Sequence, residues 1–109
     1  MNQVSVIGRL VRDPEKFAAK EGAVIVFTLA FTERDRTVYV PVLTFGKLAD
    51  AVHKYLRKGS QVAVSGKLTN RTVKYGERST RNLLEVIAER IDFLSSNKEK
   101  DKELEELPF

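Results

Sequence analysis

Apolar and polar residues alternate along much of this chain, and one internal stretch changes to a helical period. Residues 38–45, VYVPVLTF, place successive side chains on opposite faces, as a β-strand does. From residue 47 the apolar positions recur at steps of three and four residues, which stripes one side of a helix. These positions are Leu48, Val52, Tyr55 and Leu56. Gly59 can adopt the left-handed conformation that ends a helix, and alternation returns over 61–68.

Further strands are expected on both sides of this strand–helix–strand unit. They lie at 3–11, 23–32 and 83–94, and the strand that begins at Gln61 can continue through Val73. Gly8 inside the first strand indicates a bulge, a bend or the close approach of another backbone. The run 23–32 is apolar on both faces, so it is either central in a sheet or covered by a second subunit. Residues 17–22 are interpreted as a polar connection, and 33–36 and 74–78 as hairpin connections.

The stretch NLLEVIAERIDFL, residues 82–94, contains good helix formers but is predicted to be a strand. The alternation of Leu84, Val86 and Ala88 favours a strand, and a bend or bulge near Ala88-Glu89 accounts for the change of parity beyond it. Residues 95–106 have no apolar period and are dense in charge, which is typical of a disordered segment or a frayed helix.

These elements predict an all-β fold with one short α-helix. Five strands with a helix between the third and fourth follow the order of the OB-fold, a partly open Greek-key barrel. We expect residues 1–94 to form this single domain and residues 95–109 to form a disordered acidic C-terminal tail.

Composition excludes several kinds of chemistry. The 109 residues include no cysteine and one histidine, so thiol nucleophiles, disulfides and His-based metal sites are not expected, and no cofactor is predicted. Paired carboxylates occur by spacing only, without an accompanying base or nucleophile, so catalysis is not expected. There is no apolar run long enough for a bilayer and no signal-peptide pattern in MNQVSVIG, which predicts a cytoplasmic protein without a membrane partner.

Charge is distributed unevenly along the chain. Residues 1–94 carry sixteen Lys and Arg against ten Asp and Glu, a net of +6, while residues 95–109 carry three Lys against five acids, a net of −2. The two parts sum to the formal net charge of +4. A basic body indicates a polyanionic partner, although many small domains are basic for solubility alone.

Three segments together resemble the bacterial single-stranded DNA-binding protein family: NQVSVIGRLVRDPE, FGKLADAVHKYLRKGSQVAVSGKL and ELEELPF. The resemblance implies sequence-independent binding of single-stranded DNA in the bacterial nucleoid, usually by a homotetramer. It also implies recruitment of replication, recombination and repair proteins through the acidic C-terminal tip. The chain departs from the family pattern in having no tryptophan, a short loop at 33–36 and an abbreviated segment at 95–106.

Single-strand binding requires flat aromatic faces and a positive track. The resemblance implies base-stacking roles for Tyr39 and Phe45, which face the same way roughly 20 Å apart on one predicted strand. It implies basic positions along the binding path at Arg9, Lys47, Lys54, Lys58, Lys67 and Arg71. The residues themselves add an aromatic at a hairpin tip, Tyr75, and cations around it and in the 33–36 loop: Lys74, Arg78, Arg81, Arg34 and Arg36.

The tail is the second candidate site. Its acids and the apolar end that follows suit a basic-rimmed hydrophobic pocket on another protein. These residues are Glu103, Glu105, Glu106, Leu107, Pro108 and Phe109. Judged from the residues alone, a frayed end with no partner is the alternative.

Other interpretations stay open at this point. Phe45 and Tyr39 can instead fill the core, and any single Lys or Arg can be ordinary solvated surface. A primosomal or plasmid-type OB-fold accessory protein with weaker single-stranded DNA binding and a dimeric state is the alternative within the binding proteins. An OB-fold module that contacts only other proteins is the alternative from another class.

Overall fold

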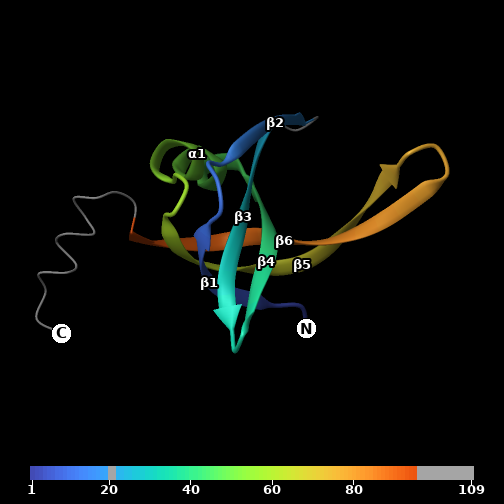
Figure 1. Cartoon of the computed structure of the whole chain (residues 1–109). Coiled ribbons are helices and arrows are strands. Elements are labelled where there is room, and N and C mark those ends of the chain that lie inside the picture. The colour runs from blue at the N-terminus through green and yellow to red at the C-terminus, as the bar shows by residue number, and fades with distance from the viewer. Residues whose placement is uncertain (20–21, 96–109) are drawn as a thin grey trace, which may run out of the picture.

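The computed structural model describes residues 1–19 and 22–95, which form six strands and one helix (Figure 1). The elements are β1 Val4–Leu10, β2 Glu15–Ala19, β3 Gly22–Glu33, β4 Arg36–Phe45, α1 Gly46–Tyr55, β5 Gln61–Tyr75 and β6 Ser79–Ser95. The tail predicted to be disordered lies, from residue 96 onward, outside the described residues. Within the described ranges, no helix has the length and apolarity needed to cross a bilayer.

The strands close into a ring. Antiparallel pairs join β1 to β5, β5 to β6, β4 to β3 and β3 to β1, and a short parallel pairing of β4 with β6 completes the circuit. This ring, with α1 between its third and fourth strands, is consistent with the OB-fold. The prediction of a mostly β barrel with a single short helix in that position is confirmed.

One strand was not predicted. Residues 15–19 form β2, which pairs with β3 from Glu15↔Val26 to Ala19↔Gly22, whereas the sequence pattern placed a polar connection over 17–22. The interpretation was wrong because EKFAA has a single large apolar residue and gains its hydrogen-bond partner only from the neighbouring strand. Gly22, at φ +119°, adopts a backbone conformation open to glycine where the chain enters β3.

The core lies inside the ring and is closed at one end by α1. Alternate residues of β3, among them Ile25, Phe27 and Leu29, point inward and are almost fully buried. The helix contributes Ala49 and Val52 to the same cluster, which also includes Leu56 just beyond it. The remaining fully or nearly buried apolar residues are Leu10, Val42, Val62, Val64, Val86 and Ala88.

The helix is shorter than its apolar stripe indicated. It ends at Tyr55, and Leu56 is already extended, with its N–H donating to the carbonyl of Val52 at 3.0 Å. Gly59, the predicted stop, instead occupies a turn at φ +88°, and its N–H donates to the Leu10 carbonyl at 2.8 Å. The early end lets Leu56 enter the core, and the turn ties the chain after α1 to β1.

Two glycines sit where backbones come close together. A Cβ on Gly8 would lie 2.7 Å from the carbonyl oxygen of Ala30, at the point where β1 passes from β5 to β3, so the predicted close approach is confirmed. A Cβ on Gly66 would lie 2.0 Å from the carbonyl oxygen of Ile87. This second contact adjoins a bulge, because Ser65 pairs with Arg90 and Gly66 with Ala88, leaving Glu89 as the extra residue. The bulge predicted near Ala88-Glu89 is therefore also confirmed.

The close backbone contact at Gly66 predicts that a side chain added there lowers the stability of the fold. Gly66→Ala should lower the free energy of unfolding by about 1–3 kcal/mol, because the new methyl group meets backbone rather than a movable side chain. Urea denaturation followed by circular dichroism measures the change. Ser65→Ala, one residue earlier on β5, is the control and should stay within about 0.5 kcal/mol of the parent. Equal stability of the Gly66→Ala variant and the parent would show that this backbone contact is not restrictive.

Candidate nucleic-acid interface

The outer face of β4 presents the two predicted aromatics to solvent. Inward-facing Val42 and Thr44 are buried, while Tyr39 is 63% exposed and Phe45 is 45% exposed on the opposite face. Thr44 holds its place in the core because its hydroxyl donates to the carbonyl of Ile25 at 2.8 Å. The alternative in which Tyr39 and Phe45 fill the core is therefore wrong.

A groove of about 670 Å³ runs over this outer face. Residues of β3 and β4 form its floor, which is largely apolar. Residues of β2 and of the turn before it form one wall, and a residue of β5 forms the other. The residues that line the groove are Arg12, Asp13, Glu15, Phe17, Ala18, Val24, Val26, Phe27, Thr28, Leu43, Phe45 and Arg71. The groove thus joins Phe45 and Arg71 from the predicted set to residues that the sequence did not single out.

Phe17 is the chief residue that sequence reasoning missed. It lies on β2, it is 50% exposed, and it lines the groove across from Phe45. The signal available in the sequence is Gly22, because a turn at this glycine brings the residues before it antiparallel to β3. Within that hairpin, Phe17 pairs with Val24 and shares its face.

Arg71 reaches the groove in a fixed orientation. Its Nε donates to Glu85 Oε1 at 3.0 Å and its Nη2 donates to Glu85 Oε2 at 3.2 Å. The Glu85 side chain is 2% exposed, whereas the Arg71 side chain is 61% exposed. A bidentate pair of this kind holds the guanidinium plane and leaves Nη1 available for an anion. Sequence reasoning placed Arg71 on the binding path and gave Glu85 no role.

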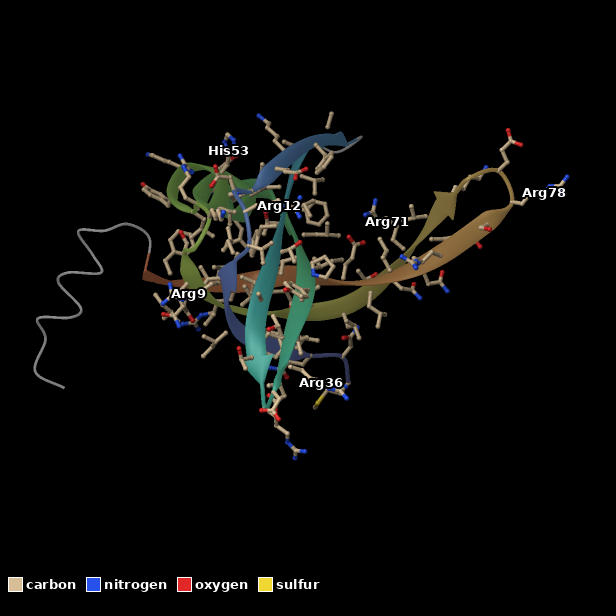
Figure 2. All side chains as sticks on the ribbon, viewed as in Figure 1. Arg9, Arg12, Arg36, His53, Arg71 and Arg78 are labelled. Atoms are coloured by element: carbon tan, nitrogen blue, oxygen red, sulfur yellow. The ribbon has the colours of Figure 1, made fainter. Side chains whose placement is uncertain are left out.

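The other predicted cations lie at separate places on the molecule (Figure 2). Arg9 belongs to β1, Arg36 begins β4 next to the turn from β3, and Arg78 lies at the far tip of the arm that β5 and β6 form beyond the barrel. Lys54 and Lys58 belong to α1 and the turn after it, and Lys47 to the first turn of α1. The remaining cations are Arg34 at the β3–β4 turn, Lys67 on β5, and Lys74 and Arg81 on the arm.

Some of these cations already have partners in the protein. Arg9 donates from Nη1 to the carbonyl of Gly59 at 2.9 Å, and Lys67 Nζ lies 3.8 Å from Glu89 Oε2 with both side chains exposed. The side chain of Tyr75 and all of the predicted tail site, 103–109, lie outside the described residues.

Residues 1–94 match the model of the Single-strand binding protein family. The chain belongs to this family. A single-stranded DNA-binding protein of Clostridium perfringens is 38% identical over 101 residues, which cover 88% of this chain and 67% of the relative. Single-stranded DNA-binding protein 2 of Clostridium acetobutylicum is 33% identical over 117 residues, which cover 100% of this chain and 86% of the relative.

A solved structure supports the same assignment. Plasmodium falciparum SSB, in a complex with ssDNA, superposes with a TM-score of 0.78 at 28% sequence identity, covering 87% of this chain and 96% of that one. The resemblance drawn from the three sequence segments is therefore confirmed. Because the Single-strand binding protein family consists of non-enzymatic DNA-binding proteins, the prediction that this chain is not an enzyme is confirmed as well.

The Arg71–Glu85 pair generates a stability prediction. Arg71→Ala should lower the free energy of unfolding by about 1–3 kcal/mol, because it leaves a buried carboxylate without its donors. Lys67→Ala is the matched control, since it removes a cation from an exposed pair and should change stability by less than about 1 kcal/mol.

The double variant Arg71→Leu/Glu85→Leu completes this test. It replaces both charges with apolar groups and should recover most of the loss. Thermal unfolding of the four proteins measures these differences. An Arg71→Ala protein as stable as the Lys67→Ala control would contradict a structural role for the pair.

Proposed function

We propose that this chain binds single-stranded DNA without sequence choice, on the outer face of β3 and β4 and in the groove above it. The observation that carries the proposal is the pair of exposed aromatics, Tyr39 and Phe45, on one face of one strand of a Single-strand binding family barrel. Large aromatic side chains that stay exposed on a protein with a well-filled core can offer their ring faces to a ligand. Nucleobases of any identity stack on such faces.

Stacking and phosphate contacts would act together. Each stacked base contributes on the order of 1–3 kcal/mol. Further cations lie at the β3–β4 turn, where they are Arg34 and Arg36, and on the arm, where they are Lys74, Arg78 and Arg81. Phosphates that pass these clusters would release counterions on binding, so the affinity would fall with added salt.

The wider role follows from the family and the sequence together. We propose that the protein protects single-stranded DNA during replication, recombination and repair in the bacterial nucleoid, and that it assembles as a homotetramer, with a dimer as the alternative. Its acidic tip, from Glu103 to Phe109, would recruit partner enzymes by offering acids followed by an apolar end to a basic-rimmed pocket.

A second candidate is an OB-fold accessory protein with weaker single-stranded DNA binding. The charge of the groove favours it: Arg12 and Arg71 among the lining residues are balanced by Asp13 and Glu15. Asp13 is engaged within the fold, since its Oδ1 accepts the backbone N–H of Lys58 at 2.7 Å. The measured affinity separates this candidate from the first.

Titration of a fluorescent oligo(dT) at two salt concentrations tests the proposal. The parent protein should bind tightly at low salt and more weakly at high salt, with a slope of about −0.7 per phosphate contact in log affinity against log salt. Tyr39→Ala and Phe45→Ala should each weaken binding by about 1–3 kcal/mol while the circular dichroism spectrum stays unchanged. No binding by the parent at low salt would favour the module that contacts only proteins, and unchanged affinity in both variants would remove the stacking roles.

Removal of the tip tests whether the barrel binds DNA and the tail separately recruits partner proteins. A variant that ends at Glu103, lacking Leu104 to Phe109, should keep its oligo(dT) affinity and lose its capture of replication and repair enzymes from a bacterial lysate. Mass spectrometry of the captured proteins, with the parent as reference, gives the readout. Loss of DNA binding on truncation would contradict the separation of the two sites.

A further inference from the structure

Three adjacent strands place Phe17, Val24 and Phe45 in a single row. Phe17 pairs with Val24 in the β2–β3 register, and Val24 pairs with Phe45 in the β3–β4 register. Residues that pair directly across neighbouring strands project from the same face of a sheet. The row therefore has an aromatic at each end and a smaller, branched apolar residue in the middle, and all three line the groove.

The spacing of the two rings suits one flat guest. Phe17 and Phe45 are two strands apart, which separates their Cα atoms by about 10 Å at the usual inter-strand distance. Their side chains are 50% and 45% exposed. Among the described residues the two rings do not contact each other; the aromatic contact found there joins Tyr55 and Phe93, whose ring centroids are 6.2 Å apart. A guest in contact with both rings needs about 7–8 Å between them, twice the optimal carbon–carbon distance.

We propose that Phe17 and Phe45 hold one nucleobase between them, with its edge on Val24. This inference rests on the proposed single-stranded DNA binding and identifies a particular subsite within it, for which β2 supplies one wall. The floor is apolar at Val24, Val26 and Leu43. The subsite would therefore contact the π-face of the base and would not hydrogen-bond to the base edge. Arg12 and Arg71 line the same groove and supply cations for the adjoining phosphates.

Tyr39 lies outside this subsite. It is on the same face of β4 as Phe45 but six residues earlier, roughly 20 Å away at the rise of a strand. A base on Tyr39 is therefore a different base from the one held in the row. Changes at Phe17 and Phe45 should be energetically coupled, whereas changes at Phe17 and Tyr39 should be independent.

A double-mutant cycle on the full chain tests the proposal, with fluorescent oligo(dT) as the probe. Phe17→Ala and Phe45→Ala should each weaken binding by about 5- to 150-fold. The double variant should be weakened by at least threefold less than the product of the two single effects, because either single change already releases the base from the sandwich. Phe17→Ala combined with Tyr39→Ala is the matched control, and its effect should equal the product of its single effects within about twofold.

Phe17→Leu distinguishes a π-face from simple apolar cover. The leucine keeps an apolar side chain on the groove, so the inferred stacking role requires that this variant bind as weakly as Phe17→Ala. The circular dichroism spectrum and the thermal unfolding of this variant should match those of the parent. Phe17 is half exposed, and it lies on β2, an edge strand that takes no part in closing the barrel.

Each other outcome overturns a defined part of the account. Parent-like affinity in Phe17→Ala or Phe17→Leu, with Phe45→Ala still weakened, would overturn the sandwich and leave the proposed function in place. Multiplicative effects at Phe17 and Phe45 would also overturn it, because the two rings would then contact different bases. Failure of the parent itself to bind oligo(dT) at low salt would overturn the proposed function together with this subsite.

Discussion

Closure of the barrel through β1 is the constraint on which the rest of the structure depends. Along Val4–Arg9 this strand pairs with β5, and at Arg9 and Leu10 it pairs with β3, so one short strand joins two ends of the sheet. The change of partner brings two backbones together at Gly8, where a side chain would collide with the Ala30 carbonyl. The turn after α1 reinforces the junction, since Leu10 exchanges backbone hydrogen bonds with Gly59 and Ser60.

Ring closure determines which side chains remain available for a ligand. Once the inward-facing residues of β3 and β4 are enclosed and α1 covers one end, the opposite faces of the same two strands must point outward. The apolar and aromatic residues on those outward faces then form the floor of a groove instead of a second core. The hairpin of β2 and the arm of β5 and β6 extend beyond the ring and flank this floor (Figure 1).

The sequence predicted those parts of the fold that depend on local pattern. Alternation over 38–45 identified β4 and the common face of Tyr39 and Phe45, and the parity change after Ala88 identified the bulge at Glu89. It did not predict β2, whose apolar content is low and whose pairing depends on β3. Nor did it show whether Phe45 is buried, because both faces of that strand are apolar and only the closed ring determines which one is inside.

The candidate site was predicted less completely than the fold, for a related reason. Spacing along the chain reveals neighbours on one strand, whereas the groove is made by neighbours across strands. Phe17 faces Phe45 only through two registers, and Glu85 finds Arg71 only because β5 and β6 pair. A carboxylate on a predicted strand gave no indication that it would be buried and hold an arginine in place.

Photo-cross-linking tests most directly whether the outer face of β3 and β4 receives the DNA strand. Ultraviolet irradiation of the full chain bound to oligo(dT), followed by proteolysis and mass spectrometry, identifies the residues that touch bases. The account predicts adducts on Tyr39 and Phe45 and on peptides from β2 and the arm. Adducts confined to α1 or to the outer face of β1, with none on β4, would contradict it.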